Sequence, residues 1–382
     1  MSKISVVALF LAITYGVGMM LFPEYHAWTM FSLAVVTGNW DPCFFNNKYI
    51  SSLFMKVHDL RLGPNPKPIE PTQVRELAKE DYSYENLRIA SDNWMEPVIV
   101  RGLYADSPAV TDWKKPGGLE PLSDFDVSVV QNSTRGKDHW INCGGHPGVD
   151  SIMQRFGDAL DEVNAYDPLS KYVSKTLVIP PASRSDRVPD PYLDAAIGKM
   201  VNDSLDLSKM GGSWTKGISN SALLQLWIGA GDEGATQGTG LHCDICNNFI
   251  VQLAGSKYWE FMHPKYSPLL RPTMKRGKTA ISGSDITTKT EVLPYIPRMV
   301  ATINEGDFMY NPDWYWHTVR NAPGYAMAIV ARECNTTNFF KANPVFSGLI
   351  VANHISAGVF GGDNYAYNRM KAALFGKSLM VE

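Results

Sequence analysis

Three residues from separated stretches of the chain have side chains that could bind one metal ion. His242 and Asp244 are separated by a single residue, and His317 ends the aromatic stretch Tyr310-Asn-Pro-Asp-Trp-Tyr-Trp-His317. Residues two places apart point to the same side of a strand, so His242 and Asp244 can present an imidazole and a carboxylate together. Two histidines and one carboxylate are a ligand set for non-haem Fe(II), and they leave positions open for a chelating 2-oxo acid and for dioxygen. The spacing therefore predicts an Fe(II) site at His242, Asp244 and His317.

A lysine lies close to this ligand pair in the sequence. Lys257 follows His242 by fifteen residues and is the one cation of the aromatic stretch Lys257-Tyr-Trp-Glu-Phe261. A buried carboxylate needs a cationic partner, so the Lys257 ammonium could bind the far carboxylate of 2-oxoglutarate. The ordinary alternative is a strand lysine that faces solvent.

The residues around the ligands favour strands that would hold them in a small barrel. Leu223-Leu-Gln-Leu-Trp-Ile228 is a buried-strand pattern, and a Gly-rich stretch from 229 to 240 leads to His242 on the next strand. Asn248 to Leu253 and Lys257 to Phe261 indicate two more strands, joined by a tight turn at Gly255. With 45% hydrophobic residues, 31 Gly and 24 Pro in 382 residues, the chain can bury a sizeable core in a turn-rich, mainly β fold with flanking helices.

These motifs together resemble a known family. The stretches are Thr239-Gly-Leu-His242-Cys-Asp244, Asn248, Gly255-Ser-Lys257, Gly306-Asp-Phe-Met-Tyr310-Asn-Pro312 and Trp316-His317, preceded by Glu96-Pro-Val-Ile-Val-Arg-Gly102-Leu. They resemble the Jumonji-C or cupin-like hydroxylases, and most of all their asparaginyl-hydroxylase branch. The resemblance runs from near Tyr84 to near Phe340.

The resemblance implies a double-stranded β-helix (jelly-roll, cupin) barrel that uses Fe(II), 2-oxoglutarate and dioxygen. It implies that the iron ligands are His242, Asp244 and His317. It also implies that Lys257 pairs with 2-oxoglutarate, with Thr239 and Asn248 as hydrogen-bond partners. The reaction would be oxidative decarboxylation of 2-oxoglutarate coupled to hydroxylation of a carbon atom, and a protein or peptide substrate is favoured over a small molecule. Trp259, Trp314 and Trp316 could shield the cavity or simply fill the barrel core.

One position departs from the pattern of these relatives. Arg332 stands fifteen residues after His317, where the asparaginyl-hydroxylase relatives tend to carry Asn. Three roles are open for it: binding the substrate, assisting the cosubstrate, or pairing with an acid at the barrel rim.

The amino terminus differs from the rest of the chain. Ile4 to Phe22 contains no charged side chain and is long enough to span a bilayer as a helix of about 20 residues. Lys3 is the one side-chain charge before it, which predicts a signal anchor with the remainder of the chain across the membrane. A cleaved signal peptide, with a small-x-small site at Gly16-Val-Gly18, and a merely buried helix are the alternatives.

We expect four regions: an anchor or signal peptide at 1–28, a juxtamembrane and Pro-rich linker at 29–83, the barrel at 84–340 and a helical extension at 341–382. The extension could mediate a homodimer. An anchor or signal peptide would place the barrel in the secretory lumen or outside the cell, where Asn132, Asn202 and Asn335 are glycosylation acceptors.

The cysteines allow a competing metal site. Cys243 and Cys246 have a Cys-x-x-Cys spacing and could bind zinc with His139, Cys143 or His146. On a strand, however, Cys243 faces away from His242 and Asp244, which favours a small apolar side chain in the barrel wall. With five Cys in all, at least one thiol stays unpaired even in an oxidising compartment.

Charge and motif content limit the remaining function classes. A net charge of -3 offers no general attraction for nucleic acid. The basic run Lys275-Arg276-Gly-Lys278 indicates a solvated loop or a contact to an acidic substrate. Two other classes stay open: a membrane-tethered binding module without turnover, and a zinc-dependent cupin enzyme without 2-oxoglutarate.

Overall fold

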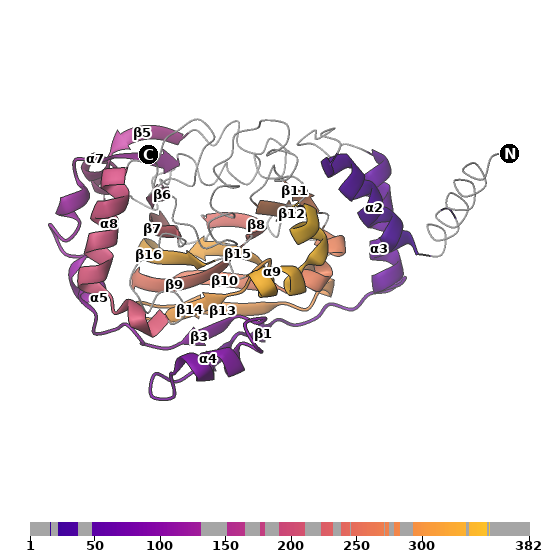
Figure 1. Cartoon of the computed structure of the whole chain (residues 1–382), viewed down its shortest axis with the longest axis horizontal. Coiled ribbons are helices and arrows are strands. Elements are labelled where there is room, and N and C mark those ends of the chain that lie inside the picture. Colours follow the sequence, from indigo (N-terminus) through magenta and orange to yellow (C-terminus); the bar gives the residue numbers. More distant parts are fainter. Residues whose placement is uncertain are drawn as a thin grey trace.

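Two facing β-sheets form the centre of the computed structural model (Figure 1). The structure describes residues 22–36, 48–130, 151–164, 176–179, 191–210, 223–231, 238–244, 246–270, 272–274, 279–282, 293–333 and 336–349, together with residues 16 and 351. The statements below concern these residues.

One sheet has nine strands. In spatial order they are β2 (Arg75–Leu77), β3 (Val98–Val100), β14 (Phe308–Asn311), β9 (Asn247–Ala254), β16 (Gly324–Glu333), β7 (Leu223–Gly231), β6 (Thr176–Ile179), β4 (Asp126–Val130) and β5 (Ser151–Arg155). All eight residues of β9 are buried, because this central strand is covered on both faces.

The other sheet has seven strands. Their order is β1 (Thr72–Gln73), β13 (Met299–Ile303), β10 (Lys257–Met262), β15 (Trp316–Asn321), β8 (Gly238–Asp244), β12 (Thr279–Ser282) and β11 (Pro272–Met274). Apart from the parallel pairs β1–β13 and β2–β3, all the strand pairs are antiparallel.

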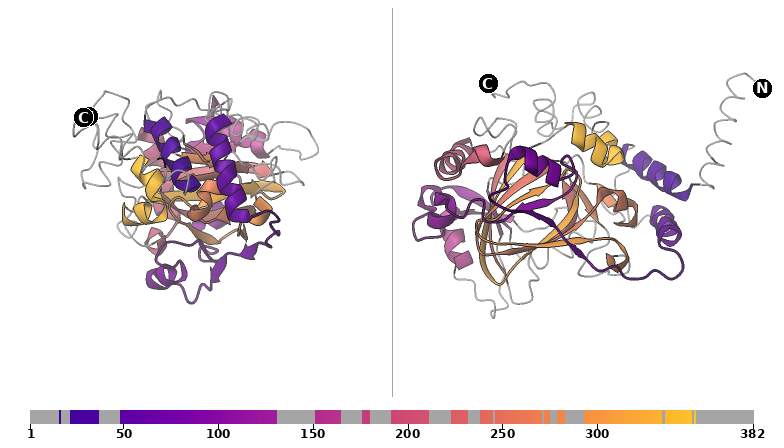
Figure 2. Two further views of the ribbon diagram at one scale, coloured as in Figure 1. Left: turned by 90° about the vertical axis from the view of Figure 1, so that its right-hand side faces the viewer. Right: turned by 90° about the horizontal axis from the view of Figure 1, so that it is seen from below.

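The chain order of the strands identifies the architecture. β7, β9, β14 and β16 lie in the nine-stranded sheet, and β8, β10, β13 and β15 lie in the seven-stranded sheet. Along the chain the path therefore crosses repeatedly from one sheet to the other, as in a double-stranded β-helix or jelly roll. The two sheets curve toward each other in the right-hand view of Figure 2. The predicted mainly β barrel with flanking helices is thus present.

An apolar core fills the space between the sheets. It contains twelve buried side chains, among them Ile250, Trp259, Phe261, Met309 and Val330. Because successive strand residues point to opposite faces, these residues mark which positions of each strand face the interior.

Helices cover the outer faces. α5 (Pro108–Asp112), α7 (Phe156–Asn164) and α8 (Pro191–Ser204) contribute to a cluster on the nine-stranded sheet. On the seven-stranded sheet, a second cluster is built with residues of α2 (Pro23–Val36), α3 (Lys48–Leu62) and α9 (Thr336–Ala342). In Figure 1, α5, α7 and α8 lie at one end of the molecule, and α2 and α3 lie at the other. The short helix α4 (Tyr84–Ala90) is capped by Ser83, whose hydroxyl accepts a hydrogen bond from the Asn86 amide at 3.0 Å.

The region before the barrel differs from the expected spacer. Within 29–83, β1 and β2 pair with strands of the two sheets, and Phe31, Phe54 and Val57 of α2 and α3 are buried in the cluster on the seven-stranded sheet. The linker expected for 29–83 is wrong for these elements, which belong to the packed domain. Strands of two and three residues beside prolines leave too little periodicity to be found in a sequence.

Within the ranges given above, no helix combines the length and apolar character needed to cross a membrane. The anchor predicted between Ile4 and Phe22 lies almost wholly outside these ranges, as do the carboxyl-terminal residues after 351.

Candidate metal and cosubstrate site

His242, Asp244 and His317 meet inside one end of the barrel. Each offers a ligand atom within 4.8 Å of the others, and all three side chains are buried. The centroids of the two imidazole rings are 4.3 Å apart. The predicted convergence of these residues is therefore found in the structure, with a donor set of two nitrogens and one oxygen that suits a divalent transition metal.

Strand register explains why residues 75 positions apart come together. His317 on β15 is the direct antiparallel partner of His242 on β8. The register then shifts, because Val319 pairs with Thr239, so three steps on β8 match two on β15. This β-bulge turns Thr239 to the same face as Val319 and His242. Without the bulge, the odd spacing from His242 would point Thr239 outward.

The backbone and its neighbours orient His317. Its Nδ1 lies 2.9 Å from the Tyr315 carbonyl oxygen, so Nδ1 carries the hydrogen and donates it, and Nε2 keeps a lone pair for a metal. The Asn311 amide lies 3.4 Å from the same Nδ1. Burial, followed by repulsion from His242, lowers the pKa of His317 to about 3. The imidazole is therefore neutral at physiological pH, which is the form that binds metals.

A strained residue and an arginine hold Asp244. Trp314 has φ +58°, a left-handed conformation that is rare outside glycine, and its amide donates to the Asp244 carbonyl oxygen at 2.9 Å. On the side chain, Arg332 Nη1 lies 3.1 Å from Asp244 Oδ2. Of the three roles open for Arg332, the structure shows pairing with an acid, and this acid is the proposed metal ligand.

Lys257 lies inside the same barrel, toward the opposite end. It shares the inward face of β10 with Trp259 and Phe261, and Phe261 is the direct partner of His317. Four residues of strand place Lys257 about 13 Å from the level of His317, a length that a five-carbon diacid and a lysine side chain can bridge together. Burial lowers the pKa of Lys257 to about 8, and no charged neighbour among the described residues offsets that cost.

Several buried polar atoms of the interior have no hydrogen-bond partner in the described structure. They include Thr239 Oγ1, Asn248 Oδ1, Asn311 Oδ1 and Arg332 Nε. Buried polar groups are normally paired, so unpaired groups near the triad indicate space for a polar ligand. The residues predicted for 2-oxoglutarate, Lys257, Thr239 and Asn248, thus fit a dicarboxylate; their contact with it stays a prediction.

The aromatic residues divide between the two faces of the seven-stranded sheet. Trp259 packs on His317, with ring centroids 5.6 Å apart and an interplanar angle of 29°. Trp314 and Trp316 instead belong to the outer cluster, where their indole nitrogens donate to Ser347 and Ser267. The suggestion that they shield the cavity is wrong, because an inward His317 places Trp316 outward.

The two described cysteines do not form a zinc site. Cys243 is a buried thiol in the outer cluster, which confirms that it faces away from His242 and Asp244. Cys246 is disulfide-bonded, so its sulfur is not available as a thiolate ligand. His139, Cys143, His146 and the basic run 275–278 lie outside the described residues.

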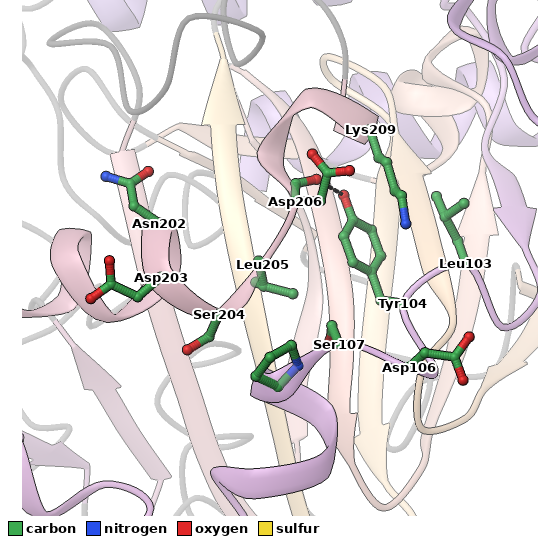
Figure 3. A pocket seen from close by; sticks show the side chains of 11 residues that line it. Leu103, Tyr104, Asp106, Ser107, Asn202, Asp203, Ser204, Leu205, Asp206 and Lys209 are labelled. Carbon is green, nitrogen blue, oxygen red and sulfur yellow. Dashed lines mark hydrogen bonds between the residues drawn. The ribbon is translucent and has the colours of Figure 1, made fainter.

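A separate cavity of about 320 Å³ lies by the ends of α5 and α8 (Figure 3). Tyr104 lines it and donates to the Asp206 carbonyl oxygen at 3.1 Å, and Lys209 Nζ lies 5.7 Å from the Tyr104 ring centroid. Tyr104 belongs to the helix-covered cluster on the nine-stranded sheet. None of the residues predicted to bind the metal or 2-oxoglutarate lines this cavity.

Sequence reasoning missed two features of the site. The first is Asn311, which stands in the motif before His317 but carried no predicted role. The second is the partner of Arg332. Both depend on which residues face each other across the barrel, and no local pattern encodes that relation.

Comparison with known proteins agrees with this geometry. Residues 92–337, well over half of the chain, match the cupin-like domain family. No curated protein matches the chain significantly. The match includes both histidines, Asp244 and Lys257, and the jelly-roll strands from β7 to β16. The chain therefore belongs to the family of cupin-like domains.

Proposed function

We propose that the protein is an Fe(II)- and 2-oxoglutarate-dependent dioxygenase that hydroxylates a carbon atom of a protein or peptide side chain. The observation that carries the proposal is the convergence of His242, Asp244 and His317 in an interior that also holds the buried Lys257. A buried ammonium without a charged neighbour in the described structure is costly, and an anionic cosubstrate would offset that cost.

Each residue has a physical task in this reaction. His242, Asp244 and His317 would hold the metal, with the His317 tautomer set by the Tyr315 carbonyl. Lys257 would bind the far carboxylate of 2-oxoglutarate, while Thr239 and Asn248 would donate or accept hydrogen bonds. Trp259 and Phe261 would exclude water from the face of His317 that they cover.

When bound, Fe(II) together with 2-oxoglutarate and dioxygen supplies the oxidant: one oxygen atom enters the substrate C–H bond, and the other enters succinate as carbon dioxide is lost. The protein contributes geometry, because three fixed ligands and one fixed cation define where the cosubstrate and the substrate lie.

The substrate and compartment are the further parts of the proposal. The motifs that resemble asparaginyl hydroxylases favour a side chain of a protein. The apolar amino-terminal segment favours a single-pass membrane protein with its barrel in the secretory lumen or outside the cell. The disulfide at Cys246 supports this location, since disulfides persist mainly in oxidising compartments.

Metal and turnover measurements on three variants of the full chain test the proposal. His242→Ala and Asp244→Ala should each lose bound Fe(II) and succinate release from 2-oxoglutarate, measured with a panel of lumenal peptides. Cys243→Ala lies between them on the outward face and should keep both activities. Turnover that survives in Asp244→Ala, or a wild-type protein that retains zinc and ignores 2-oxoglutarate, would refute the assignment.

A further inference from the structure

Two of the proposed metal ligands, His317 and Asp244, are held by different kinds of group. Nδ1 of His317 contacts the Tyr315 carbonyl, a backbone group that directly precedes β15. Oδ2 of Asp244, in contrast, forms an ion pair with a side chain from the other sheet, since β8 belongs to the seven-stranded sheet and β16, which carries Arg332, to the nine-stranded sheet. Arg332 therefore reaches across the interior to a metal ligand.

The register of the nine-stranded sheet determines the position of Arg332 and the face from which its side chain extends. Arg332 pairs with Asn248 on β9, and Asn248 pairs with Asn311 on β14. Arg332 has the same parity as Ala328 and Val330, which belong to the interior core, so its side chain starts on the inward face. A row of three polar residues, Asn311, Asn248 and Arg332, thus runs across the sheet. Asn311 at one end of the row lies close to His317, and Arg332 at the other end pairs with Asp244.

The contact between Asp244 and Arg332 is largely buried, so it is little screened by water. Asp244 has a side chain that is 6% exposed, and the Arg332 side chain is 23% exposed. Partners of metal-binding side chains set the orientation of the ligand atoms, and their loss typically costs about 10- to 100-fold in metal affinity or activity.

From these contacts we infer that Arg332 is a positioning residue, which holds the Asp244 carboxylate in the orientation that the metal requires. The inference rests on the proposed function, because it assumes that Asp244 is a metal ligand. It assigns a role to a position at which the chain departs from the pattern that its motifs resemble.

The charge of Arg332 also has an effect that opposes positioning. A guanidinium repels a divalent cation, so the charge of Arg332 alone would weaken metal binding. The two effects predict opposite results when the guanidinium is removed. If positioning dominates, metal affinity falls in Arg332→Gln; if repulsion dominates, it rises.

The experiment measures Mn²⁺ binding to the full-length protein by calorimetry and Co²⁺ binding by visible absorption, which reports ligand geometry. Arg332→Gln should bind Mn²⁺ about 10- to 100-fold more weakly and should change the Co²⁺ spectrum. Arg332→Lys keeps the charge without the planar fork and should recover part of the affinity. Thermal unfolding followed by circular dichroism identifies variants that fail to fold.

Arg298→Gln is the matched control. Arg298 pairs with Glu260 at 2.8 Å, and the two side chains are 19% and 7% exposed, close to the values of the Arg332 pair. Glu260 alternates with the inward Trp259 and Phe261 on β10, so this pair lies on the outward face of the strand. Its loss should affect stability but leave the Co²⁺ spectrum and the Mn²⁺ affinity within about threefold.

Three outcomes would overturn the inference. Arg332→Gln could bind Mn²⁺ as tightly as the wild type or more tightly, with an unchanged Co²⁺ spectrum. Arg298→Gln could weaken binding as much as Arg332→Gln does, which would indicate a general effect of lost stability. Finally, a wild-type protein that binds neither metal would refute the proposed function together with this role of Arg332.

Discussion

At the scale of single residues, the site combines groups whose charge states are set by burial. His317 is neutral because burial lowers its pKa to about 3, and Lys257 is partly neutral near pH 8 because burial disfavours its ammonium form. A neutral imidazole suits a metal, whereas the lysine must be charged to bind an anion. Burial therefore favours the neutral form of His317 that binds a metal, but it disfavours the charged form of Lys257 that binds an anion.

This contrast predicts how cosubstrate binding depends on pH. In the ligand-free protein, Lys257 is protonated below its pKa of about 8 and loses the proton above it. Since 2-oxoglutarate would bind the protonated form, its affinity should be constant at lower pH and fall up to tenfold per unit as the pH rises past 8. Calorimetry of the Mn²⁺-loaded protein between pH 6.5 and 9.5 measures this.

Lys257→Met removes the same charge at constant pH. Methionine keeps an apolar chain of similar length and removes the charge. The binding free energy of 2-oxoglutarate should fall by ~1.5–3 kcal/mol, or about 10- to 150-fold in affinity, as for the loss of a hydrogen bond to a charged group. The residual binding should no longer weaken above pH 8. Lys209→Met, in the separate cavity, is the control. Unchanged affinity in Lys257→Met would exclude the lysine from this role.

At the scale of elements, the turn between β9 and β10 positions Lys257. Gly255 has φ +61°, and a Cβ atom there would lie 2.0 Å from the Tyr325 carbonyl oxygen. The backbone of β16 approaches so closely that no side chain fits. The glycine that suggested a turn in the sequence is thus also required by the packing of a distant strand.

Alanine substitutions at Gly255 and Gly324 separate the cost of a positive φ from the cost of a steric clash with β16. Gly324 also has a positive φ, +92°, but nothing lies within 4 Å of the place that a Cβ atom would occupy. Gly324→Ala should cost roughly 1–2 kcal/mol, the cost of a left-handed conformation. Gly255→Ala should cost roughly 1–3 kcal/mol more, because of overpacking, and should also weaken 2-oxoglutarate binding. Urea unfolding measures both; equal stability losses would contradict the close approach.

At the scale of the whole molecule, the folded domain includes elements that lie before the barrel motifs in the sequence. α2 and α3 pack on the seven-stranded sheet, and β1 and β2 add strands to both sheets. The residues that lead out of the apolar amino-terminal segment are therefore part of the folded domain. If that segment spans a bilayer, the barrel lies close to the membrane surface without a spacer.

Translation of the full chain in the presence of microsomes tests the proposed location. A lumenal barrel should be protected from added protease and should gain glycans at the sequons that are accessible. Asn202 is exposed at the end of α8, so Asn202→Gln should remove one glycan step if that site is used. Full protease digestion without detergent and the absence of any glycan would place the barrel in the cytosol.

The disulfide at Cys246 offers an independent test of compartment. It lies two residues from Asp244, next to the start of β9. Thiol labelling and mass spectrometry of the protein from its native source should find Cys246 oxidised and Cys243 as a thiol. A fully reduced Cys246 would argue against the secretory pathway.

The sequence determined those features that depend on local periodicity. Because side chains alternate along a strand, the spacing of His242, Cys243 and Asp244 was enough to place the first and third on one face and the second on the other. The buried-strand patterns and the turn at Gly255 identified the β architecture, and the motifs pointed to the family that the comparison then showed.

Only the tertiary structure decided which residues face each other across the barrel. The pairing of Arg332 with Asp244 and the bulge that turns Thr239 inward join strands that are far apart in the sequence. The approach of Asn311 to His317 joins two strands that are close in the sequence but belong to different sheets. The alternation of a strand is a property of its own backbone, whereas the register between strands depends on the packing of both sheets and of the helices around them.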